Sequence, residues 1–320
     1  MGRNIFSAVS LQNAYLGECG SFSQQWCDAY ENAVLQGKPS QAEKDLLASV
    51  SPINYASSIT APTLLSQGQA DSLFPLSESS KTAQAIKKTN PNTPLSMIWH
   101  ADGHDGANSQ ATYLREQFLQ WFKKYLLNEK LEFPVFQFTR TNGSISLQDS
   151  SVIPKVFMSD KLPFESKSQQ LKLVTPTAAA IYPIGGVPGA ISALPGIGSA
   201  GALASQLLSS FAGFSPAFLP GQSGFLESAP LTEPISVVGP SSIKVRITST
   251  QPDATLFFSL VVRSPSGGIN LPNGIVAPVQ ISNISTGGSD VVVNLPETIL
   301  DASAGDVIAV GISSTDQGYE

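Results

Sequence analysis

The fold is decided by the stretch Pro62-Thr63-Leu64-Leu65-Ser66-Gln67-Gly68-Gln69-Ala70-Asp71-Ser72-Leu73-Phe74-Pro75. Residues 63–66 predict a short buried strand, and residues 68–75 predict a loop at the carboxyl end of that strand. Further along we expect a helix over 76–88, a second strand over 95–99, a loop over 100–108 and an amphipathic helix over 113–127. This alternation of strands and helices predicts a parallel sheet.

Two residues capable of acid–base chemistry follow the predicted strands. Asp71 lies in the first loop, and His104, one of only two histidines in the chain, lies in the second loop within Gly103-His104-Asp105-Gly106. Ligands of open α/β sheets bind beyond the carboxyl ends of the strands, so the two loops should lie side by side. A carboxylate beside an imidazole fixes its tautomer and stabilises the imidazolium formed during catalysis. The pattern predicts the acid and base of a serine-hydrolase triad.

A purely structural interpretation of these residues stays open. A Gly-His-x-Gly loop can serve only to turn the chain, and an Asp after a strand can cap the next helix. The order of acid before histidine is that of the α/β-hydrolases, which favours the catalytic interpretation. We interpret His100 as a nearby polar or packing residue. We interpret Asp102 and Asp105 as loop or surface carboxylates. They lie so close to His104 in the sequence that they would need a strained geometry to reach its Nδ1.

The second half of the chain has a different pattern. Short apolar or alternating runs separated by Pro, Gly, Ser and Asn occupy residues 135–138, 171–174, 243–247, 256–262, 276–281, 291–295 and 307–312. They predict an antiparallel β-sandwich or jelly roll. The expected fold class is thus α/β plus all-β, with a partial hydrolase domain over residues 1–130 and a β-domain over residues 131–320. Residues 177–222 form an Ala/Gly/Pro-rich insertion, with one short helix expected near 203–211.

Composition excludes several classes of partner and ligand. The net charge is -6 and the 18 Lys and Arg residues are scattered, which predicts neither a nucleic-acid-binding surface nor a polybasic membrane patch. No apolar run is long enough to span a membrane. Cys19 and Cys27 have no Cys or His partner at ligand spacing, so we expect no metal site. They favour two reduced thiols over a disulfide-closed loop of an exported protein.

The N-terminal sequence predicts no signal peptide. It becomes polar by Gln12 and Asn13, before an adequate apolar segment has formed. The sequence leaves the compartment and the oligomeric state open.

Several segments resemble one family of hydrolases. The segments Ser51-Pro52-Ile53-Asn54-Tyr55, Ala61-Pro62-Thr63-Leu64-Leu65, Asp71-Ser72-Leu73-Phe74-Pro75-Leu76 and Gly103-His104-Asp105-Gly106 are similar to late segments of the X-Pro dipeptidyl-peptidase and cocaine-esterase-like hydrolases. Residues 228–240 and 304–316 resemble the beginning and end of that family's C-terminal jelly roll. The resemblance covers most of residues 50–320, with 177–222 aligning poorly. It implies Asp71 as triad acid, His104 as base, a peptide or small ester substrate, and no metal or organic cofactor.

The nucleophile of that family is missing from this sequence. No Gly-x-Ser-x-Gly occurs: Gly221-Gln222-Ser223-Gly224 follows His104, in the wrong domain, and Gly198-Ser199-Ala200-Gly201 has the wrong spacing. We therefore expect the C-terminal part of a serine hydrolase, as a fragment, a truncated gene product or one piece of a split enzyme whose serine comes from a separate chain. Alone it should have little or no activity.

A second hypothesis concerns a protein without catalysis. The β-domain would then be a binding or interaction module, and the α/β part a vestigial remnant. A sheet edge left open by the missing strands could also drive self-association.

Overall fold

The computed structural model describes residues 22–36, 38–71, 73–103, 109–147, 173–175, 180–182, 190, 218 and 221–316. The chain divides into two compact units, one of Met1–Thr60 with Ala85–Thr93 and the other of Ala61–Gln84 with Pro94–Glu320. The helix predicted near 203–211 lies outside the described residues.

The first unit is helical in its described residues. It contains α2 (Gln24–Gln36), α3 (Gln41–Ser49) and the 3-10 helix η2 (Pro52–Ser58). Ser40 caps α3: its side chain accepts from the Glu43 N–H, and the Glu43 carboxylate accepts from the Ser40 N–H. The Asn90 amide donates to the carbonyls of Ala56, Ser57 and Ile59, which ties η2 to the segment after the last turn of α4.

One expectation for this unit is wrong. Cys27, in α2, is disulfide-bonded, whereas the sequence favoured reduced thiols. The other cysteine of the chain, Cys19, lies outside the described residues.

The second unit begins with a four-stranded sheet in the order β1-β2-β3-β4. The elements are β1 (Thr63–Gly68), α4 (Leu76–Thr89, whose residues 85–89 belong to the first unit), β2 (Leu95–His100), α5 (Ala111–Leu126), β3 (Phe136–Thr139) and β4 (Ile145–Leu147). The first three strands are parallel, and β4 is antiparallel to β3. The predicted alternation of strands and helices is confirmed in this part of the chain.

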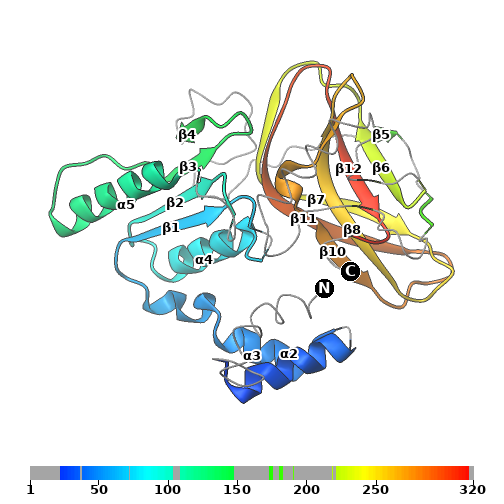
Figure 1. Ribbon diagram of the computed structural model, residues 1–320, viewed down its shortest axis with the longest axis horizontal. Helices are drawn as coiled ribbons and strands as arrows, with labels where there is room; N and C mark the ends of the chain where they lie inside the picture. Colours follow the sequence, from blue (N-terminus) through cyan, green and yellow to red (C-terminus); the bar gives the residue numbers. More distant parts are fainter. Residues whose placement is uncertain are drawn as a thin grey trace. The chain divides into compact units, whose positions relative to one another are not determined.

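Helices cover both faces of this sheet. Trp99 of β2 is fully buried, and its indole N–H donates to Ser79 Oγ of α4 at 3.3 Å. The opposite face of β2 and β3 carries Ile98 and Gln137, which are paired in register, and the Tyr113 hydroxyl of α5 donates to the Gln137 amide oxygen. Because successive side chains of a strand point to opposite faces, α4 and α5 lie on opposite faces of the sheet (Figure 1).

The strand predicted over 135–138 forms, but it belongs to the first sheet and not to the β-domain. We expect it from the sequence among the antiparallel strands, whereas β3 pairs in parallel with β2 of the first sheet. The reason is burial. Phe136 and Phe138 are 0% and 1% exposed, and the Phe136 ring packs edge-on against Trp99, with 5.0 Å between the ring centroids. The first sheet therefore continues to residue 147.

The rest of the unit is a β-sandwich. A six-stranded sheet has the order β10-β8-β12-β6-β5, with β9 paired to β8, and a long two-stranded ribbon joins β11 to β7. These strands are β5 (Leu173–Thr175), β6 (Ser223–Ser228), β7 (Ile235–Ile247), β8 (Ala254–Arg263), β9 (Ile269–Asn270), β10 (Ala277–Ile281), β11 (Ser289–Ala302) and β12 (Val307–Ser313). The pairs between these named strands are antiparallel, as the sequence predicted.

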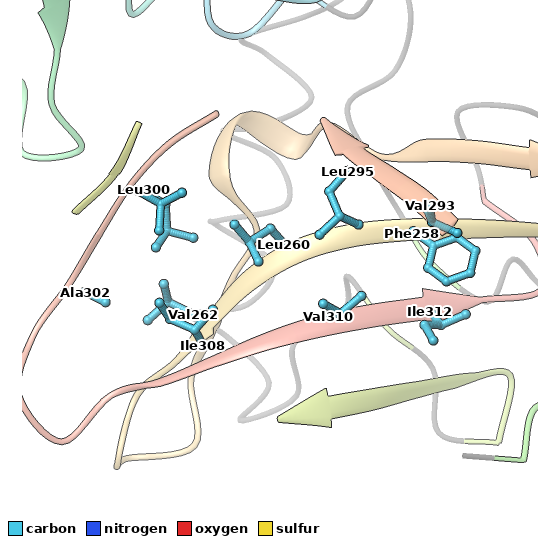
Figure 2. Close-up of a cluster of buried hydrophobic side chains, with 11 residues drawn as sticks. Phe258, Leu260, Val262, Val293, Leu295, Leu300, Ala302, Ile308, Val310 and Ile312 are labelled. Atoms are coloured by element: carbon cyan, nitrogen blue, oxygen red, sulfur yellow. The ribbon is translucent and has the colours of Figure 1, made fainter. Parts of the chain in front are cut away.

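The six-stranded sheet and the ribbon pack together through an apolar core. Buried side chains from β8 and β12 face those from the ribbon, among them Phe258, Leu300 and Ile308, which are at most 3% exposed (Figure 2). Burying one such side chain contributes about 1.5–3 kcal/mol. The expected fold class, a partial α/β-hydrolase sheet followed by a β-sandwich, is confirmed.

Candidate functional site

The loops after β1 and β2 are joined by backbone hydrogen bonds beyond the end of the strands. The Gln69 N–H donates to the His100 carbonyl at 2.8 Å, and the Ala70 N–H donates to the Asp102 carbonyl at 3.3 Å. Because β1 and β2 are parallel, both loops leave the same edge of the sheet. The predicted side-by-side placement of the two loops is thus observed as far as residue 103.

Two glycines make this close approach of the loops feasible. A Cβ atom on Gly68 would lie 2.1 Å from the Asp102 carbonyl oxygen. A Cβ atom on Gly103 would lie 2.6 Å from the Ala70 carbonyl oxygen and 3.3 Å from the Asp71 nitrogen. Any other residue at either position would push the loops apart, so the juxtaposition depends on glycine at both.

Asp71 lies in this junction with its carboxylate fixed on both oxygens. The side chain is only 5% exposed. Its Oδ1 accepts from the N–H groups of Leu73 and Phe74, at 3.0 and 2.8 Å, and its Oδ2 accepts from the Gln67 amide at 3.1 Å. A carboxylate offers about four lone-pair positions, so Oδ2 keeps room for one more donor, such as an imidazole N–H.

His104, the predicted base, lies outside the described residues, as does Asp105. The described chain ends at Gly103, which packs on the backbone of Ala70 and Asp71. It resumes at Ser109, where the Ser109 hydroxyl donates to Asp102 Oδ1 at 2.7 Å. The Gln110 N–H donates to Asp102 Oδ2 at 3.2 Å, so this carboxylate closes the loop and is buried rather than on the surface.

His100 is a half-buried neighbour of the two carboxylates. Burial lowers the pKa of its imidazole, while the charges of Asp102 and Asp71 act in the opposite direction. Its Nδ1 is buried and, among the described residues, has no hydrogen-bond partner. These properties agree with the interpretation of His100 as a nearby polar or packing residue.

Sequence reasoning missed two glutamines at this site. Gln67 bonds both the Asp71 carboxylate and the Phe74 carbonyl, the latter at 2.7 Å. Gln69 is 7% exposed, and its amide donates to the carbonyls of Trp99 and Thr139 at the ends of the neighbouring strands. The available signal was a glutamine on each side of Gly68, at the carboxyl end of β1.

Neither a cluster of metal ligands nor a membrane-spanning helix occurs among the described residues. Within the described ranges, no three His, Cys, Asp or Glu residues are grouped so that they could hold a metal ion. Over the same residues, every helix is too short or too polar to cross a bilayer.

A parallel sheet with an acidic loop at its carboxyl edge, followed by a β-sandwich, defines a class of protein, the α/β-hydrolases with a C-terminal β-domain. Residues 5–129 match the prolyl oligopeptidase family. Residues 219–320 match the C-terminal non-catalytic domain of X-Pro dipeptidyl-peptidase. Two separate segments of the chain thus match domains of these peptidase families, which confirms the resemblance to the X-Pro dipeptidyl-peptidase and cocaine-esterase-like hydrolases seen in the sequence.

Solved structures give the same fold at low sequence identity. An α-amino acid ester hydrolase is 16% identical with a TM-score of 0.56, over 83% of this chain and 50% of its own. An aminopeptidase from the marine sediment archaeon Thaumarchaeota archaeon is 14% identical with a TM-score of 0.53, over 87% of this chain and 50% of its own. The chain thus spans about half the length of these two structures. A comparison with curated proteins gives no match.

Proposed function

We propose that this chain supplies the acid and the base of a serine hydrolase, with Asp71 as the acid and His104 as the base. The supporting observation is the packing of Gly103 on the backbone of Ala70 and Asp71, because His104 follows Gly103 directly in the chain. The nucleophilic serine would come from polypeptide outside this sequence, which contains no Gly-x-Ser-x-Gly.

The chemistry follows from these roles. Asp71 accepts the Nδ1–H of His104 and so presents Nε2 to the serine. Nε2 takes the serine proton as Oγ attacks the substrate carbonyl, and then gives that proton to the departing amine or alcohol. Water, deprotonated by the same nitrogen, hydrolyses the acyl-enzyme and restores the serine. The three donors on Asp71 hold its carboxylate still during this cycle.

We propose a small peptide or ester as the substrate. The family matches include an X-Pro dipeptidyl-peptidase domain, and the two similar solved structures are named as an amino acid ester hydrolase and an aminopeptidase. A dipeptide ending in proline, linked to a chromogenic anilide, and a p-nitrophenyl ester represent the two substrate types.

Labelling with a fluorophosphonate probe tests this function. The purified chain should be neither labelled nor active on either substrate. Together with the polypeptide encoded directly upstream, a serine of that polypeptide should become labelled. Asp71→Asn should then slow turnover by about 10⁴-fold, the loss seen when a triad acid becomes an amide.

The two histidines provide a matched pair of variants. In the reconstituted mixture, His104→Gln should abolish labelling, whereas His100→Gln should retain it. Equal labelling of His104→Gln and the unchanged chain would refute His104 as the base. Turnover of either substrate by the chain alone, at the rate of a complete serine hydrolase, would refute the missing nucleophile.

A second candidate function has one observation in its favour, because the match over residues 219–320 is to a domain described as non-catalytic. In this alternative the β-sandwich binds a partner and the α/β part has lost its chemistry. Reconstitution separates the two: an upstream polypeptide without a labelled serine favours the binding module.

A further inference from the structure

The β-sandwich is bonded to the first sheet at the edge that carries Asp71. Arg140 and Thr141, which directly follow β3, bond Asp301 of β11. Gln69, which directly follows β1, accepts from Asn273 of the 3-10 helix η3 (Pro272–Gly274). Because β1 and β3 are parallel, these contacts lie at the carboxyl ends of the strands, where Asp71 lies.

The contact at Gln69 fixes the entry of the acid loop. The Gln69 amide nitrogen donates to the carbonyls of Trp99 and Thr139, at 3.2 and 2.8 Å, and its amide oxygen accepts from Asn273 Nδ2 at 3.5 Å. All three contacts hold the buried side chain of Gln69, which precedes Asp71 by two positions. Of these contacts, the one with Asn273 comes from the β-sandwich.

A second contact fixes the exit of the loop. The helix α4 begins at Leu76, and the hydroxyl of Ser80 in its second turn donates to the Glu297 carboxylate. Glu297 lies in β11 at the register shift between Leu295 and Thr298. An irregularity of this kind re-aims the side chain of a strand, here towards α4.

Glu297 is an unusual residue for such a place. Burial raises the pKa of its carboxyl, the Ser80 hydroxyl and the Lys81 charge act against that rise, and the Glu78 charge adds to it. Partial burial of this carboxylate costs free energy, and the bond from Ser80 offsets part of that cost.

We propose that Asn273 and Glu297 are positioning residues, through which the β-sandwich holds the loop of Asp71 at its entry and its exit. The significance of Asp71 rests on the proposed function, whereas the order of the loop can be measured without any activity. A displaced acid would misalign the histidine, and a misplacement of about 1 Å can cost on the order of 10²-fold in rate.

Amide hydrogen exchange in the full chain reads the position of the carboxylate directly, because the N–H groups of Leu73 and Phe74 are protected by Asp71 Oδ1. Glu297→Leu removes the acceptor of Ser80 and should speed exchange at these two amides by about fivefold, the equivalent of one hydrogen bond. Glu297→Gln keeps an acceptor for Ser80 and should preserve the protection.

The entry contact has its own matched pair of variants. Asn273 and Asn283 both have positive φ, 56° and 58°, so glycine suits the backbone at either position. Asn273→Gly removes the donor to Gln69 and should speed exchange at Leu73 and Phe74. Asn283→Gly makes the same backbone change away from the loop and should leave both amides unchanged.

The outcomes are distinct. Unchanged exchange at both amides in Glu297→Leu and Asn273→Gly would overturn the proposal, and so would an equal acceleration throughout α5 and the sandwich, since that reports global destabilisation. If Glu297→Leu does not fold, Ser80→Ala removes the same bond from the other side. Faster exchange together with fluorophosphonate labelling that survives Asp71→Asn would support the positioning role and refute Asp71 as the acid.

Discussion

Gly103 and Ala70 lie so close that their backbones leave no space for a side chain. A Cβ atom on Gly103 would come within 2.6 Å of the Ala70 carbonyl oxygen and 2.8 Å of its carbonyl carbon. The contact joins the acid loop to the loop that continues into His104. Since both neighbours are backbone atoms, rotation of a side chain cannot relieve the overlap.

Gly103→Ala should therefore destabilise the protein by about 1–3 kcal/mol, the usual cost of overpacking. The loops must separate, so labelling of the reconstituted hydrolase should fall as well. Chemical denaturation measures the loss of stability. Gly287→Ala is the matched control, because a Cβ atom there meets nothing within 4 Å. Equal stability of the two variants would contradict the close approach of the loops.

Asp301 should contribute strongly to stability through its contacts with Arg140 and Thr141, which follow β3, and with Ser236 of β7. Its carboxylate accepts from Arg140 at 2.7 Å, from the hydroxyls of Ser236 and Thr141 at 2.5 and 2.7 Å, and from the Thr141 N–H at 3.1 Å. Asp301→Ala should cost about 2 kcal/mol, because hydrogen bonds to a charged group are the stronger kind and this one is partly exposed. Urea denaturation at pH 7 measures it.

The pH dependence of that effect follows from the pKa of Asp301. Burial alone would raise the pKa, but the bonds from Arg140, Ser236 and Thr141 outweigh it and hold the pKa below the usual 3.8. The stabilisation is thus present above pH 3.8 and is lost as the pH falls through the lower, folded-state value. Asp290→Ala, at a well-exposed ion pair with Arg246, should cost less than about 1 kcal/mol. If Asp290→Ala lost more stability than Asp301→Ala, the larger contribution assigned to Asp301 would be refuted.

Several features of this fold follow from local pattern. The short strand segment at 63–66, the loop residues after it and the period of the helix at 113–127 are local properties, so the strand–helix alternation and the position of Asp71 at a strand end were predictable. The capping box at Ser40 and Glu43 is equally local. Such features need no knowledge of what packs against them.

The features that sequence reasoning missed are non-local. The run at 135–138 identified a strand but not its partner, which is decided by the packing of Phe136 and Phe138 against the core around Trp99. The amides of Gln67 and Gln69 read as ordinary polar residues, since their partners are brought together only by the completed sheet. The contact of Glu297 with Ser80 joins two domains and leaves no local signal.

His100 should make the protein less stable in mild acid. Burial lowers the pKa of His100 from 6.5, so the unfolded chain binds a proton more readily than the folded one. The stabilisation is complete above pH 6.5 and is lost as the pH falls towards the folded-state pKa. His100→Gln should flatten the dependence of the melting temperature on pH between about 7 and 5. Identical slopes for the variant and the unchanged chain would show that His100 is not desolvated.

Tyr113 should be important for the packing of α5 because its hydroxyl serves a buried amide. It donates to Gln137 Oε1 at 2.5 Å, and Gln137 is 1% exposed. Burial raises the pKa of Tyr113 to about 12, so it stays a donor throughout the stable range. Tyr113→Phe leaves that oxygen without this donor and should cost about 1–3 kcal/mol.

The control for Tyr113→Phe is the same substitution at a solvent-facing tyrosine. Tyr182 is 69% exposed, and Tyr182→Phe should change stability by less than about 0.5 kcal/mol. Gln137→Leu combined with Tyr113→Phe removes both polar partners from the contact, so the double variant should recover part of the loss. Losses that simply add would show that the hydroxyl and the amide contribute independently, because paired groups show a coupling energy in such a cycle.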